Sequence, residues 1–218
     1  PVGGLHFLSR DAWVPPALAA RLRAWHPQTD LGRIVRECLR YLPADLAGEL
    51  VDRMTSVVVM ESSLALVVFR GPGRHWRTSE DYGIVSRRVV TNNGVAAIVD
   101  AFQNTVELET FNYHGIGTGV AAEAAADSAL GTELTTEYTG NVRATGTQSE
   151  PSTNIYRTVG TNTLDSGTPA VTEHGVFTQA ATGGGTLLDR SVFAAINLVG
   201  ANGDSLQSTY SNTFTAGS

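Results

Sequence analysis

The sequence predicts a mainly β protein, an antiparallel β-sandwich or jelly-roll-like domain that follows a partly helical N-terminal arm. The first observation is threonine, which occurs three times before residue 90 and twenty-two times from Thr91 onward. Because β-branched side chains suit the pleated, half-buried surface of a sheet, this shift favours strands in the later part of the chain. The other two observations are segments with period-two alternation and the turn residues that separate them.

Period-two alternation is clearest near the C terminus. Leu206, Tyr210 and Phe214 fall on one face of a predicted strand, and residues 155–161 alternate in the same way. Four segments between the predicted strands have turn composition: Thr139-Gly-Asn, Asp165-Ser-Gly-Thr-Pro, Thr182-Gly-Gly-Gly and Ala201-Asn-Gly-Asp. Many strands joined by such turns favour an antiparallel sandwich over a parallel sheet.

Two regions are predicted: residues 1–88 as a mixed helical and strand arm or docking region, and residues 89–218 as the sandwich. Apolar residues at helical spacing predict helices after Pro16, after Asp30 and over residues 45–54. The elements expected next are strands at 57–59 and 64–69 (or one long bent strand), a strand over 82–90, and a helix over 95–102 capped by Thr91 or Asn92.

Charge is divided unequally between these regions. Residues 1–88 contain twelve basic and nine acidic side chains, a net charge of +3, whereas residues 89–218 contain three and twelve, a net charge of −9. We therefore expect partner contacts at the basic and aromatic side chains of the first region: Arg33, Arg36, Arg40, Arg70, Arg74, Trp76 and Arg77. A solvated helix face or an exposed loop would explain the same residues. Nucleic-acid binding is not expected, since the acidic region would repel a phosphate backbone.

The segment TEHGVFTQAATGGGTLLDRSVF, residues 172–193, contains residue types used in catalysis. Glu173 and His174 would point to opposite faces of a strand, whereas His174, Asp189 and Ser191 could share a face across a hairpin. A nucleophilic triad also needs an oxyanion hole and a sharp nucleophile turn, and no serine here lies in a Gly-x-Ser-x-Gly motif. We therefore predict a hairpin whose Asp189 and Arg190 form a local surface ion pair.

Neither cofactor nor metal binding is predicted. The glycine-rich segments lack the lysine and following helix of a phosphate loop, and the five histidines are scattered along the chain. Residues 113–117 resemble residues 173–177, so His114 and His174 could converge, with Glu173 or Glu109 as a third ligand. A histidine hydrogen-bonded within a strand is the simpler interpretation. No apolar run reaches the length of a membrane helix, and no enzymatic activity is predicted.

Several sequence blocks over about residues 89–218 together resemble a group of tailed-bacteriophage virion proteins. These blocks are Val89-Val-Thr-Asn-Asn-Gly, Asn112-Tyr-His-Gly-Ile-Gly-Thr-Gly, Thr158-Val-Gly-Thr, Thr172-Glu-His-Gly-Val-Phe, Gly185-Thr-Leu-Leu-Asp-Arg-Ser-Val-Phe and Gly203-Asp-Ser-Leu-Gln. The resemblance implies a structural component of the virion, assembled in the host cytoplasm.

Within the virion, we expect a capsid decoration or cement protein that stabilises the head through repeated contacts. Its partners would be the major capsid protein or other virion proteins, and further copies of the chain in a homo-oligomer. The alternative is a receptor-binding module of a tail fibre or spike, which would use loops such as residues 115–126 or 180–186. A virion-associated glycosidase is a third hypothesis, and it would require two carboxylates beside an aromatic groove.

Overall fold

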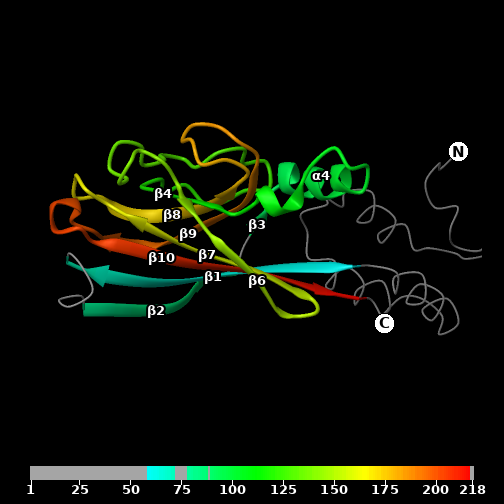
Figure 1. Ribbon diagram of the computed structural model, residues 1–218, viewed down its shortest axis with the longest axis horizontal. Coiled ribbons are helices and arrows are strands. Elements are labelled where there is room, and N and C mark those ends of the chain that lie inside the picture. Colours follow the sequence, from blue (N-terminus) through cyan, green and yellow to red (C-terminus); the bar gives the residue numbers. More distant parts are fainter. Residues whose placement is uncertain (1–57, 72–77, 88, 217–218) are drawn as a thin grey trace, which may run out of the picture. The chain divides into compact units, whose positions relative to one another are not determined.

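The computed structural model describes residues 58–71, 78–87 and 89–216, and Val59–Thr215 form one compact unit. The mainly β prediction is confirmed, because this unit consists of two antiparallel sheets packed as a sandwich, together with one short α-helix (Figure 1). The helices expected in the first 57 residues lie outside the described residues.

The first sheet has the strand order β2-β1-β10-β7-β6. Its strands are β1 (Val59–Arg70), β2 (Thr78–Ser86), β6 (Thr147–Ser152), β7 (Ile155–Thr163) and β10 (Ser205–Thr215). The long strands β1 and β10 pair in continuous antiparallel register, from Val59 opposite Thr215 to Phe69 opposite Ser205. This pairing forms the centre of the sheet.

The second sheet has the order β3-β9-β8-β4-β5. Its strands are β3 (Val89–Val90), β4 (Tyr113–Gly117), β5 (Ala144–Thr145), β8 (Ala170–Phe177) and β9 (Leu187–Asn197). β8 and β9 form the predicted hairpin around the glycine-rich segment, and their antiparallel pairing confirms it. Two 3-10 helices, η1 (Leu108–Thr110) and η2 (Gly200–Asn202), lie in the connections.

Period-two alternation decides which side chains fill the space between the sheets. In β1, Leu64, Leu66 and Val68 are fully buried while their neighbours are partly exposed, and Leu206 and Tyr210 of β10 are also fully buried. Burying each such side chain contributes about 1.5–3 kcal/mol to folding. The alternation predicted for β10 is therefore the pattern of the core, whereas the buried face of β7 carries the small and polar residues Thr158, Gly160 and Asn162.

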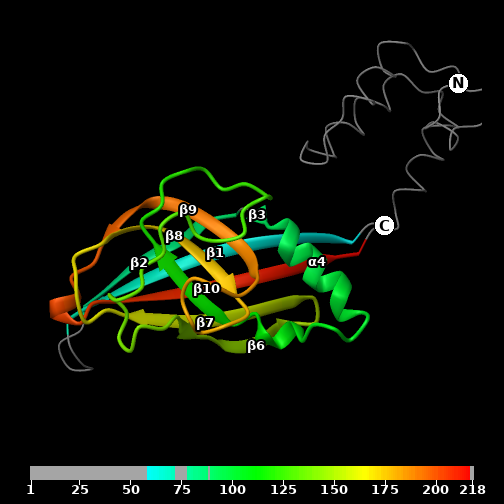
Figure 2. The same cartoon turned by 90° about the horizontal axis from the view of Figure 1, so that it is seen from above.

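Helix α4 (Asn92–Ala101) lies at the end of the sandwich where β1 begins and β10 ends (Figures 1 and 2). The predicted cap is confirmed: the backbone N–H of Gly94 donates to Thr91 Oγ1 at 3.0 Å. Gly94 lets the helix approach β9 closely, because a Cβ there would lie 2.5 Å from the carbonyl oxygen of Leu188. No helix in the described part of the chain is long and apolar enough to cross a membrane.

The sandwich begins at Val59 rather than at the predicted boundary of residue 89. β1 and β2 precede that boundary, yet they hydrogen-bond into the first sheet through β10. The strand expected over residues 82–90 is also divided, since β2 ends at Ser86 in one sheet and β3 begins at Val89 in the other. Local alternation cannot reveal such a crossing, because both pieces have strand composition.

Candidate functional site

Strand pairing brings His114 and His174 into contact between the two sheets. In the β4–β8 register, His114 lies opposite Val176 and Ile116 lies opposite His174, which places both rings on the inward face. The Nδ1 atom of His114 is 2.9 Å from Nε2 of His174, and both residues are fully buried. The repeated His-Gly motif allows this convergence as the less favoured alternative, and the structure shows it as a hydrogen-bonded pair of rings. On its other side, His114 Nε2 is 3.1 Å from Thr158 Oγ1 of the opposite sheet.

Two glycines make room for the His114 ring. A Cβ at Gly160 would lie 2.4 Å from His114 Cδ2, and one at Gly146 would lie 2.1 Å from Thr158 Oγ1. Real Cβ atoms do not come this close to their neighbours, so any side chain at either position would displace the ring or its partner. The glycine of the Val-Gly-Thr block is therefore a packing requirement.

Burial keeps both imidazoles neutral. It lowers the pKa of His114 to about 3, and burial together with the neighbouring His114 lowers the pKa of His174 well below its ordinary value. One neutral ring then donates to the other, while Nδ1 of His174 has no hydrogen-bond partner within the described residues. Glu173 points to the opposite face of β8, and the described residues contain no group of three His, Cys, Asp or Glu side chains that could hold a metal ion.

Asp189 forms a second buried polar group on the same inward face. Its two carboxylate oxygens accept hydrogen bonds from Ser62 at 2.7 Å and from Ser191 at 3.2 Å. Burial raises the pKa of Asp189 to about 7. Burial and the nearby Asp189 raise the pKa of Tyr210, whose hydroxyl has no hydrogen-bond partner in the described part of the chain. We call His114, His174, Asp189 and Tyr210 the inner cluster.

The hairpin places His174, Asp189 and Ser191 on one face, as the alternation predicts, and all three are buried. Ser191 donates to Asp189, but His174 hydrogen-bonds His114 instead of the serine. The three side chains lie inside the sandwich, where the opposite sheet covers them. A triad needs the histidine beside the nucleophile, and this arrangement does not provide that.

The expected surface ion pair between Asp189 and Arg190 is wrong. Adjacent strand residues face opposite sides, so Asp189 points inward and Arg190 points to the outer face of the second sheet. There Arg190 Nη2 lies 2.8 Å from Glu173 Oε2, and Nη1 lies 2.8 Å from Asp127 Oδ2. Both Arg190 and Glu173 are buried, so this is an interior pair.

The long connection between β4 and β5 encloses Glu173. The Glu173 carboxylate accepts hydrogen bonds from the backbone N–H groups of Gly119, Gly131 and Thr132 at 2.9, 2.8 and 2.7 Å. Burial alone would raise the pKa of Glu173, but the hydrogen bonds from these N–H groups and from Arg190 together lower it. Figure 1 shows the connection lying over β4 and β8. Glu173 therefore attaches the loop to the sheet.

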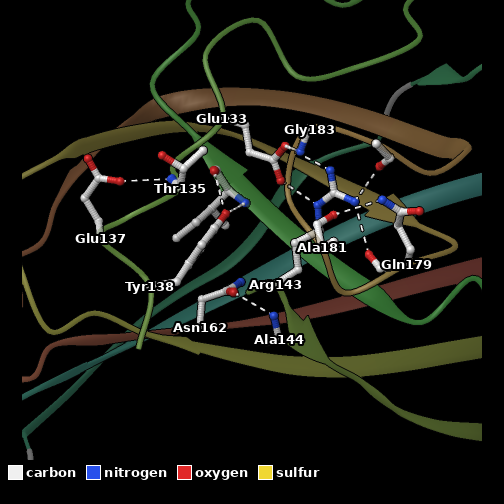
Figure 3. Close-up of polar contacts among 12 residues, drawn as sticks. Glu133, Thr135, Glu137, Tyr138, Arg143, Ala144, Asn162, Gln179, Ala181 and Gly183 are labelled. Carbon is white, nitrogen blue, oxygen red and sulfur yellow. Dashed lines mark hydrogen bonds and ion pairs between the residues drawn. The ribbon is translucent and has the colours of Figure 1, made fainter. Parts of the chain in front are cut away.

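Arg143 and Glu133 form a second attachment on the same face (Figure 3). Arg143 Nη2 donates to Glu133 Oε2 at 2.9 Å, and Nη1 donates to the carbonyl oxygens of Gln179 and Gly184. The guanidinium carbon lies 3.5 Å from the centre of the Phe177 ring, a cation–π contact. We call Glu173, Arg190, Asp127, Arg143 and Glu133 the outer cluster. It ties the β4–β5 and β8–β9 connections to the second sheet.

Sequence reasoning did not predict the outer cluster, although arginine content offered a signal. Only three arginines follow residue 88, namely Arg143, Arg157 and Arg190. Two of these are almost fully buried, with 2% of their surface exposed, which is rare for arginine unless it is paired. In an acidic region with so few cations, each arginine was a candidate for a structural ion pair.

Arg70 is the one predicted partner contact that the structure describes. It pairs with Glu80 and Asp204 at 2.9 Å each and donates to the carbonyl oxygen of Asn197 at 2.6 Å. These bonds connect β1, β2 and the β9–β10 connection. Contact with a partner at Arg70 stays a prediction, and the other six predicted residues lie outside the described ranges: Arg33, Arg36, Arg40, Arg74, Trp76 and Arg77.

No protein-family model matches the sequence, and no curated protein is significantly similar to it. The resemblance to tailed-bacteriophage virion proteins therefore stays a prediction.

Proposed function

We propose that the chain is a structural protein of a tailed-bacteriophage virion, and within the virion a capsid decoration or cement protein. One observation carries the proposal. The blocks that resemble virion proteins contribute His114, Glu173, His174, Asp189 and Arg190, and all five side chains are buried in internal contacts. The polar residues that first suggested chemistry are used to hold strands and loops together, which supports a role based on shape and surface.

The outer cluster also supports a structural role. It ties two long connections to the second sheet with buried ion pairs and backbone hydrogen bonds, so these loops keep a defined shape. A rigid surface loses little conformational entropy on binding, which favours repeated weak contacts on a capsid. We do not propose an enzymatic role, because the candidate catalytic side chains lie between the sheets.

Self-association is part of the proposal. β2 is an edge strand of the first sheet and exposes Tyr82 and Ile84, which are 43% and 53% accessible. An exposed edge with apolar side chains favours pairing with another chain. We therefore expect a homo-oligomer in solution, and light scattering after gel filtration measures it. A strictly monomeric chain at high concentration would contradict this part.

The test of the virion role is quantitative mass spectrometry of purified particles of the phage that encodes the chain. A decoration protein would be present in on the order of hundreds of copies, following the symmetry of the head. About six to eighteen copies would favour the tail-fibre or spike alternative instead. Absence from purified virions would overturn the proposal in both forms.

A further inference from the structure

An apolar pocket opens at the α4 end of the sandwich, and its lining includes no residue of either cluster. Its volume is about 440 Å³. Its apolar walls come from α4, the η1 segment and four strand or loop positions: Ile98, Leu108, Phe111, Tyr156, Leu188 and Phe214. A pocket of this size accepts an aromatic ring with room for a neighbouring side chain.

One polar side chain in this pocket has no hydrogen-bond partner within the part of the chain that the structure describes. Asn212 of β10 lines the pocket, is only 2% exposed, and its amide oxygen accepts no hydrogen bond from any described residue. Two other polar side chains of the wall are already bonded: Gln148 Nε2 donates to Tyr156, and the Tyr156 hydroxyl donates to the carbonyl of Phe111. A buried amide without a partner is destabilising, so a ligand that brings one donor would be favoured here.

An exposed apolar stripe continues from the pocket along α4. Val95, Val99 and Phe102 are 51%, 55% and 87% exposed and recur at helical spacing, and Leu108 is 42% exposed. Ile98 belongs to the same side of the helix and lines the pocket. Contiguous apolar surface beside a pocket is typical of a protein interaction site and extends beyond what a small ligand needs.

Acidic side chains border this surface. Glu109 and Glu150 line the pocket, and Glu107 precedes Leu108 in the chain. All three are exposed, and none forms an ion pair with another described residue. Unpaired carboxylates around an apolar pocket complement a segment that carries cations.

We propose that this pocket binds a tyrosine side chain presented by a partner-protein segment that also carries arginine or lysine. The ring would pack against Phe111, Tyr156 and Phe214, the hydroxyl would donate to the Asn212 amide, and the cations would face Glu109 and Glu150. The apolar residues beside the tyrosine would cover the α4 stripe. This inference depends on the pocket and not on the virion role.

The test uses three probe peptides and the full chain labelled with ¹⁵N. The probes are acetyl-Arg-Tyr-Leu-Arg-amide, the same peptide with phenylalanine for tyrosine, and acetyl-Glu-Tyr-Leu-Glu-amide. We expect the first to shift the resonances of Asn212 and Gln148 in a saturable way. Loss of one neutral hydrogen bond should weaken the phenylalanine peptide about five-fold. The acidic peptide should bind more weakly still.

Two variants separate the pocket from other surfaces. Asn212→Leu should make the tyrosine and phenylalanine peptides bind equally, since it removes the acceptor and keeps the size of the side chain. Ser149→Trp should abolish binding of all peptides, because Ser149 lies exposed at the pocket wall and a large ring there fills the opening. Dispersed amide spectra of both variants control for folding.

Three outcomes would overturn the proposal. The first is that no peptide shifts the pocket resonances of the unaltered chain. The second is that p-cresol binds as tightly as the basic peptide, which would indicate a small-molecule site. The third is that the pocket resonances shift with protein concentration alone, which would identify the occupant as a second copy of the chain.

Discussion

The inner and outer clusters include side chains from opposite faces of the same two strands, β8 and β9, yet their buried polar groups are stabilised in different ways. In the inner cluster, burial lowers the pKa of the histidines and raises the pKa of Asp189, which favours the neutral form of each side chain. His174 Nδ1 and the Tyr210 hydroxyl have no hydrogen-bond partner among the described residues. The outer cluster buries full charges, and Glu173 is matched by Arg190 and three backbone N–H groups.

The difference follows from which donors each face can supply. Between the sheets, backbone groups are already paired in the ladders, so only side chains remain to satisfy a buried polar group. On the outer face, the β4–β5 connection brings free backbone N–H groups to the carboxylate. A buried charge is tolerated where counter-ions and N–H donors surround it, and elsewhere the group becomes neutral.

The largest effect should come from breaking the outer cluster. Arg190→Met removes the counter-ion of Glu173 and leaves a buried carboxylate, so we expect a loss of about 3–5 kcal/mol in the free energy of unfolding. Urea denaturation measures it. Arg157→Met is the matched control, since Arg157 is half-buried and, among the described residues, hydrogen-bonds only Ser211; its cost should stay below about 1 kcal/mol. Equal losses for both variants would contradict the comparison.

Replacing the Asp189 carboxyl of the inner cluster by a permanently neutral group should stabilise the protein, in contrast to the loss expected for Arg190→Met. The pKa of Asp189 is raised to about 7 from 3.8, so the folded state binds more protons and wild-type stability attributable to this group falls as pH rises from about 4 to 7. Asp189→Asn should therefore be increasingly stabilising across that window and constant above it, on the order of a few kcal/mol. The pH dependence that His114 and His174 contribute to stability is present in both proteins, so it cancels in the difference between wild type and Asp189→Asn.

Thermal unfolding of wild type and Asp189→Asn from pH 4 to 9 measures this effect. A difference that does not change with pH would show that Asp189 is ionised in the folded protein throughout the range. If Asp189→Asn instead became less stable than wild type as pH rises, the result would contradict a raised pKa of Asp189.

A smaller effect tests whether the histidine pair is held by close packing. Gly160→Ala places a methyl group where His114 now lies, and overpacking of this kind costs about 1–3 kcal/mol. His114→Ala removes the ring, so Gly160→Ala should cost much less in that background. The double-mutant cycle by denaturant unfolding gives the coupling. Additive costs would mean that the glycine matters for another reason.

The smallest effect concerns Ser191, the residue that a triad would use as its nucleophile. Ser191→Ala removes one hydrogen bond to Asp189, so we expect a loss of about 1 kcal/mol and a further rise in the pKa of Asp189. Carbon-detected NMR titration of the Asp189 carboxyl follows the shift. Ser128→Ala, at an exposed position, should change neither quantity. If the pKa of Asp189 is unchanged in Ser191→Ala, the hydrogen bond from Ser191 does not stabilise the Asp189 carboxylate.

Much of the sandwich could be predicted because its information is local. Alternation in β7 and β10, the Thr91 cap and the β8–β9 hairpin each depend on residues that are close in sequence. The start of the sandwich could not be predicted, because the partner of β1 is β10, at the far end of the chain. The composition change near residue 90 marked a difference in side chains and not a boundary of the fold.

The sequence by itself determined which side of each strand a residue occupies, because side chains alternate along any extended backbone. It therefore separated Glu173 from His174 before any partner was known. Only the tertiary structure decided what each side meets: His114 for His174, and Arg190 with the β4–β5 connection for Glu173. Those partners are distant in the chain, and their contact depends on how the two sheets and their loops pack.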